Sequence, residues 1–575
     1  MRILLLTHAF NSLTQRLGAE LQRRGHEISI EFDIADSVAE EAVALFKPDL
    51  IVAPYLRRAI PESIWSQYTC LIVHPGIIGD RGPSALDWAI QQGEAEWGVT
   101  VLQAEAEMDA GPIWASAAFP LRHAKKSSIY RNEVTQAATG AVLQALERFI
   151  AGNFVPTPLA ACGEARGRLR PLMKQTERVI DWHRDDTATV LRKINAADGF
   201  PGVADTLFGE PCHIFDAWPE AILHGELGSK PGEALARREG ALLRRTRDGA
   251  LWIGHAKRAG DLKLPATLAF APESAALAEA PLQGWWRAGS ETWQDIAYEE
   301  SGSDENAVGF LHFEFYNGAM STAQCVRLQS ALAWAKQRPV KVLVLMGGAD
   351  FWSNGIHLNV IEAADSPADE SWNNINAMND VARELIEAGD QITVAALAGN
   401  AGAGGCFLAR AADHVWAREG VMLNPHYKNM GNLYGSEYWT YLLPRRVSEE
   451  GARGIMRNRQ PLTAQSAAEI GFTDACLAGD PQAFRIDVAR RAAEIVAAPE
   501  LAAQLSAKRE RRARDEAEKP LTAYREEELA HMRRNFYGFD PSYHVARHHF
   551  VRKSLASWTP RHLARHRDLG WKVPT

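Results

Sequence analysis

A glycine-rich junction between a buried strand and a helix constrains this chain more than any other stretch. Residues 394–415 begin with an apolar run, continue through Gly399, Gly402, Gly404 and Gly405, and end in an alanine-rich segment. Glycine permits close backbone approach and unusual φ/ψ angles, and the first turn of a helix has N–H groups without intrahelical partners. Such a turn can hold a carbonyl oxygen that gains negative charge during a reaction. It can equally be a tight strand–helix junction with only a packing role.

A similar stretch, Val340–Leu358, lies about fifty residues upstream and also changes from an apolar strand to glycines. Together the two stretches resemble the crotonase (enoyl-CoA hydratase/isomerase) superfamily, whose corresponding turns form an oxyanion hole for a CoA thioester. By that resemblance, the N–H groups of Ile356 and Gly404 are the two oxyanion donors. Gly355 and Gly405 stand beside them and would line the same cofactor site.

The composition is that of a folded protein with several domains. A chain of 575 residues, 46% of them hydrophobic, has room for about three or four domains. A net charge of −8 argues against general nucleic-acid binding. The six cysteines contain no CxxC pair, so they predict neither a metal site nor a disulfide framework and suit a reducing compartment. The sequence contains no signal peptide or membrane-spanning run. We therefore expect a cytoplasmic protein with no membrane, nucleic-acid or metal partner.

The N-terminal part has the alternating pattern of an α/β fold. Short apolar strands at residues 2–6, 26–32, 49–53 and 70–73 alternate with helical segments, which is typical of a mostly parallel sheet with a Rossmann-like arrangement. The fourth strand leads into a loop rich in glycine and proline, which cannot be helical. We expect this domain to occupy residues 1–170.

Candidate residues for proton transfer stand in that loop and in a later turn. His74 follows the strand, Arg81 and Gly82 lie in the loop, and Asp109 begins the motif D-A-G-P-I. This set resembles the formyltransferase domain of methionyl-tRNA formyltransferases and other enzymes that use 10-formyl-tetrahydrofolate. The resemblance implies that His74 and Asp109 are the catalytic pair: Asp109 orients His74 and stabilises its cation, while the imidazole assists proton removal from the acceptor. Arg81 and Gly82 would line the cofactor site.

One position departs from that family. The family has an asparagine two residues before the histidine, where its amide polarises the formyl oxygen, and this chain has Ile72 there. The oxyanion contact must therefore come from another group or be weaker.

The rest of the chain divides into three further segments. Residues 171–290 resemble the small β-barrel (OB-like) domain that follows the formyltransferase core, with a hairpin signal at Arg247–Gly249. Residues 300–500 resemble a crotonase-like α/β spiral domain. A charged, helical C-terminal extension occupies residues 501–575, and within it Arg552 is a candidate for binding a CoA phosphate.

The crotonase-like domain lacks both glutamates with which the hydratases of its family add water. The resemblance places these glutamates at Phe407 and His426, so the sequence argues against hydration of an enoyl-CoA. Tyr427 and Glu437 are the candidate replacements, because they lie in a loop dense with groups that can move protons. Alternatively, Glu437 stands in the first turn of a helix capped by Ser436, and the tyrosine only packs.

The fusion of these domains resembles, over nearly the whole chain, the HypX/HoxX family of hydrogenase maturation proteins. The resemblance implies an enzyme that is both a formyl-group transferase and a CO-forming lyase. It would move the formyl group of 10-formyl-tetrahydrofolate to coenzyme A and then decarbonylate formyl-CoA. Tetrahydrofolate and CoA would be its small-molecule partners, and NiFe-hydrogenase maturation proteins its protein partners, since the CO becomes a ligand of the NiFe centre. The CoA thiol must reach both sites, which predicts a continuous internal channel.

Two other interpretations stay open. The chain could be a formyl-tetrahydrofolate hydrolase that releases formate, with a non-catalytic CoA-binding half. It could also be a non-catalytic CoA- or folate-binding partner in maturation. The isoleucine at position 72 keeps both open.

Overall fold

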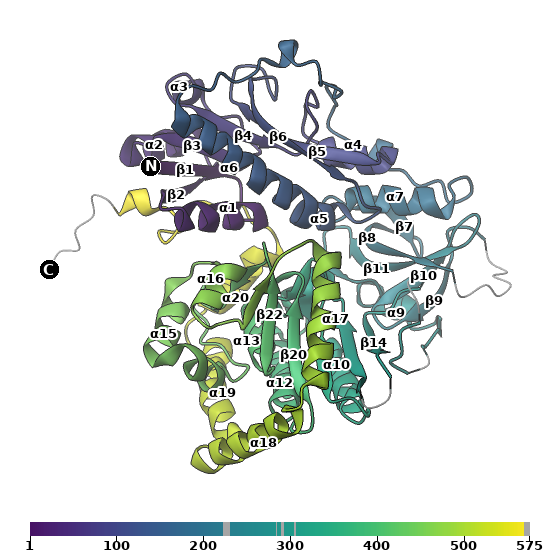
Figure 1. The fold of residues 1–575 in the computed structure, drawn as a ribbon. Helices are drawn as coiled ribbons and strands as arrows, with labels where there is room; N and C mark the ends of the chain where they lie inside the picture. The colour runs from purple at the N-terminus through teal and green to yellow at the C-terminus, as the bar shows by residue number, and fades with distance from the viewer. Residues whose placement is uncertain (222–229, 283, 289–291, 304–305, 569–575) are drawn as a thin grey trace. The chain divides into compact units, whose positions relative to one another are not determined.

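A computed structural model gives the fold as two compact units (Figure 1). The first contains Met1–Glu279 and Leu555–Thr575, and the second contains Ala280–Ser554. The structure describes residues 1–221, 230–282, 284–288, 292–303 and 306–568. The predicted boundary at residue 290 and the last part of the C-terminal extension, from residue 569, lie outside the described residues. The extension is shared between the units, with its long helices in the second and its end in the first.

The first unit begins with a six-stranded sheet in the order β2-β1-β3-β4-β5-β6. The four strands predicted from apolar runs are confirmed as its parallel part, and β5 and β6 continue it antiparallel. The elements are β1 (Arg2–Thr7), α1 (Ser12–Arg23), β2 (Glu27–Phe32), α2 (Asp36–Phe46), β3 (Leu50–Tyr55), α3 (Glu62–Trp65), β4 (Cys70–His74), α4 (Ala85–Gln92), β5 (Glu96–Gln103), β6 (Ile113–Pro120), α5 (Lys126–Ile129) and α6 (Thr135–Ala151).

Helices cover both faces of this sheet (Figure 1). On one face, side chains of α1, α4 and α6, such as Leu17 and Val142, pack in one apolar cluster with Leu5 of β1. On the other, α2 and α3 bury Val43 and Ile64. Burial on both faces explains why the strands are continuously apolar rather than alternating.

A second sheet in the same unit has seven strands, in the order β13-β9-β10-β11-β8-β7 with β12 beside β11. The predicted hairpin at Arg247–Gly249 is confirmed, because Arg245 of β10 pairs with Ala250 of β11. The elements are α7 (Thr187–Ala197), β7 (Val203–Leu207), β8 (Glu210–Glu220), β9 (Ala234–Arg238), β10 (Ala241–Arg245), β11 (Ala250–Arg258), β12 (Lys263–Pro265), α8 (Ala266–Ala269), α9 (Ala271–Ser274) and β13 (Ala278–Glu279).

The chain's end returns to the first sheet. His566 is fully buried against β2, where its ring contacts Ser29 Oγ at 2.7 Å and Glu31 Oε2 at 2.9 Å. Thr559 also donates to Glu31, and Arg567 Nη2 lies 2.6 Å from the same carboxylate. Three side chains of the last described segment thus anchor it to two residues of the edge strand.

The second unit contains a six-stranded sheet in the order β14-β15-β17-β20-β22-β25, with smaller sheets beside it. From β15 onward its strands are parallel. The strands are β14 (Ile296–Ser301), β15 (Val308–Phe313), β16 (Ala319–Met320), β17 (Val342–Leu345), β18 (Phe351–Ser353), β19 (Gly355–Ile356), β20 (Ile392–Leu397), β21 (Asn400–Gly402), β22 (His414–Arg418), β23 (Met422–Asn424), β24 (Leu462–Thr463) and β25 (Ala475–Leu477).

Helices pack on both sides of this sheet as well. On one side α10, α12 and α13 bury residues such as Leu328, Val381 and Leu408, and on the other α17 buries Phe484 and Val488. The helices are α10 (Thr322–Ala335), α11 (Leu358–Ala363), α12 (Pro367–Ile386), α13 (Gly404–Arg410), α14 (Trp439–Leu442), α15 (Pro444–Asn458), α16 (Ala464–Glu469), α17 (Pro481–Ala497), α18 (Leu501–Glu518), α19 (Leu521–Tyr537) and α20 (Ser542–Val551).

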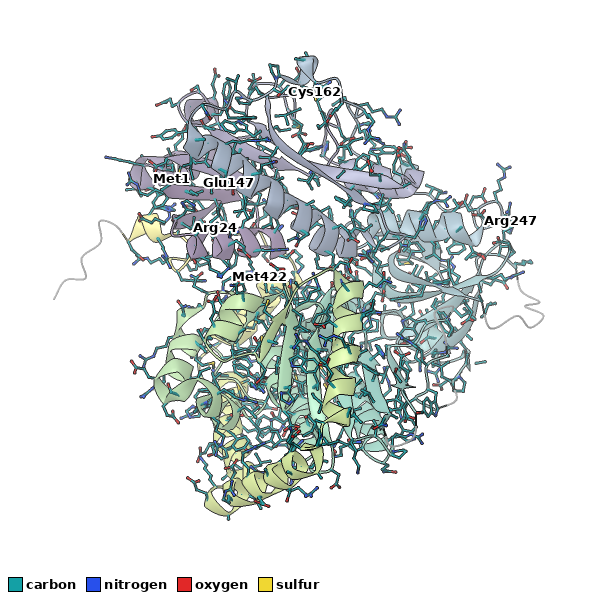
Figure 2. The ribbon with its side chains drawn as sticks, in the orientation of Figure 1. Met1, Arg24, Glu147, Cys162, Arg247 and Met422 are labelled. Carbon is teal, nitrogen blue, oxygen red and sulfur yellow. The ribbon has the colours of Figure 1, made fainter. Side chains whose placement is uncertain are left out.

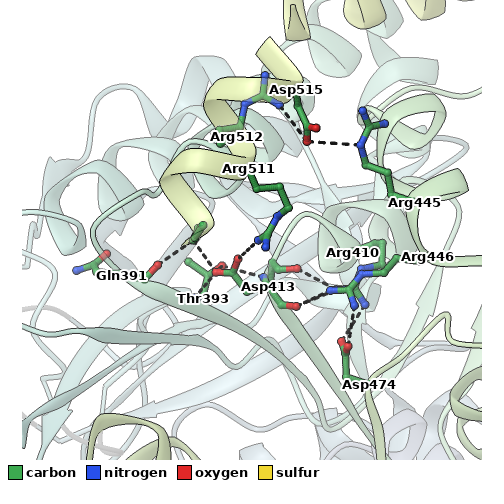
Figure 3. Close-up of polar contacts among 12 residues, drawn as sticks. Gln391, Thr393, Arg410, Asp413, Arg445, Arg446, Asp474, Arg511, Arg512 and Asp515 are labelled. Atoms are coloured by element: carbon green, nitrogen blue, oxygen red, sulfur yellow. Dashed lines mark hydrogen bonds and ion pairs between the residues drawn. The ribbon is translucent and has the colours of Figure 1, made fainter. Parts of the chain in front are cut away.

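Polar contacts dock the highly charged helix α18 onto this unit (Figure 3). Lys508 Nζ donates to Gln391 O at 2.8 Å and to Asp413 Oδ2 at 2.5 Å. The same carboxylate accepts from the N–H and the hydroxyl of Thr393, both at 2.9 Å. Burial lowers the pKa of Lys508, and the charge of Asp413 opposes that shift. The position of α18 therefore depends on a paired buried charge as well as on apolar contact.

Among the described residues, no helix is both long and apolar enough to cross a lipid bilayer. Figure 2 labels side chains of both kinds: Arg24, which follows α1 and pairs with Glu20, is 44% exposed, whereas Met422 in β23 is buried.

Candidate active sites

The first candidate site lies where β4 ends. His74, its last residue, is buried between two carboxylates. His74 Nε2 lies 3.1 Å from Asp80 Oδ1, and His74 Nδ1 lies 3.5 Å from Asp109 Oδ2. The structure thus brings the predicted pair together, and it adds Asp80, which the sequence analysis missed.

Arg170, ninety positions further along the chain, holds the carboxylate of Asp80 in place. The Asp80 side chain has no exposed surface, and its Oδ2 accepts from Arg170 Nε at 2.8 Å. Arg170 also donates to Gln92 Oε1 at 2.6 Å and lies over the ring of Trp97. A buried carboxylate needs such a partner, since an unpaired buried charge is costly.

The predicted cofactor residues Arg81 and Gly82 lie in the loop between these carboxylates. Gly82 N donates to Asp109 Oδ2 at 3.0 Å. Gly82 has φ of 109°, and a Cβ atom there would clash with Arg170 O, so the position favours glycine twice over. Arg81 pairs with Glu107, and its backbone bonds to Arg168 and Arg170. These contacts therefore fix the position of the loop beside His74.

Two carboxylates beside one imidazole can stabilise the positive charge that the ring gains when it accepts a proton. This arrangement suits a base that must stabilise its own cation. Ile72, two residues before His74, packs in the apolar cluster that α2 and α3 form with the sheet. Its side chain offers no donor for a formyl oxygen.

The second candidate site gathers the two glycine-rich stretches. A Cβ atom built on Gly355 would lie 3.3 Å from Gly404 N, so the segment that ends in Ile356 lies against the start of α13. A Cβ atom on Gly405 would clash with Ser353 O. The glycines therefore allow the two backbones to meet. The preceding residue, Ala403, has φ of 47°, which is strained for a residue with a side chain.

The place where the backbone at Gly355 meets Gly404 is called the glycine corner below. Tyr427 and Glu437 lie beside it. Tyr427 Oη donates its hydrogen to Glu437 Oε2 at 2.5 Å and also lies 2.9 Å from Ser436 O. A Cβ atom on Gly404 would lie 2.6 Å from Glu437 Oε1, which places the carboxylate over the glycine corner. Burial raises the pKa of Glu437 to about 7, although the hydrogen bond from Tyr427 lowers it. Burial and the charge of Glu437 raise the pKa of Tyr427 well above its usual range.

Phe407 occupies the position where hydratases of the crotonase family have a glutamate. It is fully buried, and its ring stacks on Tyr427 with centroids 5.3 Å apart and an interplanar angle of 14°. The phenylalanine that stands in place of a hydratase glutamate thus packs against Tyr427 of the Tyr427–Glu437 pair.

The alternative interpretation of Glu437 as a first-turn helix residue is wrong. Helix α14 begins at Trp439, and its N-cap is Tyr438 rather than Ser436. Glu437 and Tyr438 have φ of 60° and 59°. Two successive side-chain-bearing residues in the left-handed region are unusual, and such strain is concentrated at functional sites.

The predicted phosphate ligand Arg552 lies just after α20 and is about half exposed. Its Nε is 3.9 Å from Glu362 Oε1, a carboxylate that also pairs with Arg547 and His548 at 2.8 Å. This places Arg552 at the edge of a basic cluster. Among the described residues, no group of three or more His, Cys, Asp or Glu side chains is arranged to hold a metal ion.

Three protein families match consecutive parts of the chain. Residues 31–146 match the formyl transferase family, residues 172–271 match the formyl transferase C-terminal domain, and residues 314–559 match the enoyl-CoA hydratase/isomerase family.

Two of the similar proteins cover almost the whole chain, and a third covers its first part. The hydrogenase maturation factor HoxX of Bradyrhizobium diazoefficiens is 53% identical over 569 residues, which are 99% of this chain and 97% of that protein. A crystal structure of HypX from Aquifex aeolicus in complex with tetrahydrofolic acid is 48% identical, with a TM-score of 0.95 and complete coverage of both chains. Methionyl-tRNA formyltransferase of Roseiflexus castenholzii is 32% identical over 241 residues, which are 40% of this chain and 73% of that enzyme.

Proposed function

Because the chain belongs to the HypX/HoxX family of hydrogenase maturation factors, we propose that it makes carbon monoxide from a folate-bound formyl group. In the first step, 10-formyl-tetrahydrofolate would donate its formyl group to the thiol of CoA. In the second, formyl-CoA would lose CO and regenerate CoA. The CO would serve, in the cytoplasm, as a ligand for the NiFe centre that other maturation proteins assemble.

The first step belongs at His74. The imidazole takes the thiol proton as the CoA sulfur attacks the formyl carbon, and Asp80 and Asp109 stabilise the resulting cation. When the C–N bond breaks, the proton passes to N10 of tetrahydrofolate. Arg81 and Gly82 belong to the loop that shapes this site.

The second step belongs at the Tyr427–Glu437 pair. The backbone amides of Ile356 and Gly404 would polarise the formyl oxygen, and Glu437 as a carboxylate would take the formyl proton. As the C–S bond breaks, its electron pair leaves with sulfur, CO departs, and the proton returns to the thiolate to give CoA. The tyrosine hydroxyl, held at 2.5 Å, stabilises the carboxylate. Arg552 would bind a CoA phosphate.

One observation carries the proposal: a buried tyrosine–glutamate pair lies against the glycine corner, and a phenylalanine stands where a hydratase needs a carboxylate. The pair can move one proton between carbon and sulfur. Because it is almost completely buried, it is poorly suited to activating bulk water.

The decisive experiment follows a carbon label. The protein is incubated with CoA and 10-formyl-tetrahydrofolate labelled in the formyl carbon, and released CO is trapped by reduced haemoglobin. We expect labelled CO from the unmodified protein, and formyl-CoA accumulation without CO from Glu437→Gln. Label found only as formate, with CoA present, would reject the second step. The control is the same reaction without CoA, in which we expect no transfer of the label.

A further inference from the structure

Side chains of neighbouring helices hold the segment that carries Glu437, residues 434–440 (the 434–440 loop). The loop has no regular structure until α14 begins at Trp439, yet Gly435 to Tyr438 are buried. Buried backbone N–H groups need acceptors, because leaving one unpaired costs about as much as losing a hydrogen bond. The acceptors here come from α12 and α19.

Glu528 of α19 accepts hydrogen bonds from the end of the loop. Its Oε2 accepts from Tyr438 N at 2.9 Å, and its Oε1 accepts from Thr440 N at 2.9 Å and from Thr440 Oγ1 at 2.6 Å. The side chain is fully buried. Both carboxylate oxygens thus accept from residues just after Glu437, one from Tyr438 and the other from Thr440.

The same face of α19 holds the start of the loop. Met532 Sδ accepts from Gly435 N at 3.2 Å, and Asn535 Oδ1 accepts from Tyr434 N at 3.2 Å. His531 stacks on Tyr434 with ring centroids 4.0 Å apart. Residues 528, 532 and 535 are four and three positions apart, which places them on one helix face. This face of α19 therefore contacts the loop from Tyr434 to Thr440.

Asn379 of α12 holds the loop from another side. Its Oδ1 accepts from Glu437 N at 2.8 Å and from Ser436 Oγ at 2.7 Å. Glu437 is thus fixed by Asn379 at its own amide and by Glu528 at the next one. Two left-handed residues in succession persist only where the surroundings fix them in this way.

We propose that Glu528 is a positioning residue for the acid–base pair: it locks the 434–440 loop so that the Glu437 carboxylate meets both Tyr427 and the Gly404 corner. The proposal rests on the proposed function of that pair. A neutral amide could not replace Glu528, because one of its two polar atoms would be a donor facing another donor at Tyr438 or Thr440. Burial and the charge of Glu437 raise the pKa of Glu528 to about 8, whereas the hydrogen bonds from Thr440 and Tyr438 favour its carboxylate form.

The kinetic test uses Glu528→Gln and Glu528→Asp in the full chain, with Glu526→Gln as the matched control on the exposed face of the same helix. We expect Glu528→Gln to lower kcat for CO release from supplied formyl-CoA by about 100-fold, the scale of a 1 Å misplacement. KM for formyl-CoA and formyl transfer from the folate stay within about twofold. Glu528→Asp recovers part of the lost rate, and Glu526→Gln behaves as the unmodified protein. Unchanged CO release from Glu528→Gln overturns the proposal.

A second measurement is independent of activity. Hydrogen–deuterium exchange of peptides that cover the 434–440 loop should be at least about tenfold faster in Glu528→Gln and unchanged in Glu526→Gln, because exchange reports local opening. If the unmodified protein makes no CO, the proposed function fails, and exchange alone decides whether Glu528 fixes the loop. Retained protection in Glu528→Gln then overturns the proposal.

Discussion

The imidazole of His74 lies closer to Asp80, at 3.1 Å, than to Asp109, at 3.5 Å. Asp80 is also the more buried carboxylate and is tied to Arg170. Since the nearer, less solvated charge interacts more strongly with the ring, Asp80 should contribute at least as much as Asp109 to stabilising the histidine cation.

We predict that Asp80→Asn and Asp109→Asn each lower CoA-dependent formyl transfer by about 100-fold or more, the scale of general acid–base effects. The rate is measured as consumption of 10-formyl-tetrahydrofolate with excess CoA. Asp36→Asn, which alters an exposed pair with Arg58, serves as the control and should have no effect. A large loss from Asp109→Asn with none from Asp80→Asn would contradict the role given to Asp80.

The rate of CO release from formyl-CoA should depend on pH through Glu437. Burial raises the pKa of this carboxyl to about 7, and the proposed step needs the carboxylate. The rate should therefore rise about tenfold for each pH unit below 7 and level off above it. Tyr427 and Glu528 are the titratable neighbours, and burial raises the pKa of both. A rate independent of pH between 5.5 and 8 would mean that Glu437 is not the base.

Stability should show the opposite pH dependence. A carboxyl whose pKa is raised from 4.5 to about 7 on folding keeps its proton more tightly when folded, so stability falls as pH rises through this interval. The loss amounts to about 3 kcal/mol above pH 7, at about 1.4 kcal/mol per pKa unit. Glu437→Gln should therefore raise Tm at pH 8 and have little effect at pH 5, as thermal melts would show. Equal shifts at both pH values would be inconsistent with a buried, ionising Glu437.

The sequence predicted those features that local pattern controls. Continuous apolar runs predicted the parallel strands, because strands buried on both faces are apolar throughout. The motifs shared with formyltransferases predicted that His74 and Asp109 act as a pair. Asp80 was missed because its burial depends on Arg170, which lies ninety positions further along. Glu528 was missed for the same reason: in sequence it is one of three successive glutamates on a charged helix, and only the fold distinguishes it from its exposed neighbours Glu526 and Glu527.

The end of the chain gives a prediction about stability. Glu31 is fully buried, and although burial raises its pKa, the hydrogen bonds from His566 and Thr559 lower it overall. Because the folded-state pKa is depressed, this stabilisation is present above pH 4.5 and is lost as pH falls below it. His566→Ala leaves a buried carboxylate short of a partner and should destabilise the first unit by about 3 kcal/mol at pH 7. Glu41→Gln, which removes only the exposed partner of Arg567, should leave the melting curve almost unchanged; equal effects of the two changes would contradict the anchoring role.

Phe407 should control which product formyl-CoA yields. Its ring stacks on Tyr427 and fills the place of a hydration carboxylate, so Phe407→Leu should loosen the tyrosine and admit water. We expect slower CO release and a rising share of formate among labelled products. Phe472→Leu is the matched control, because Phe472 is equally buried and its ring is edge-on to that of Phe407, with centroids 6.2 Å apart, rather than stacked. Since both changes remove similar apolar volume at similar cost in stability, a shift toward formate in both variants would trace it to general loosening of the core, whereas a shift in Phe407→Leu alone assigns the choice of CO to the stacked pair.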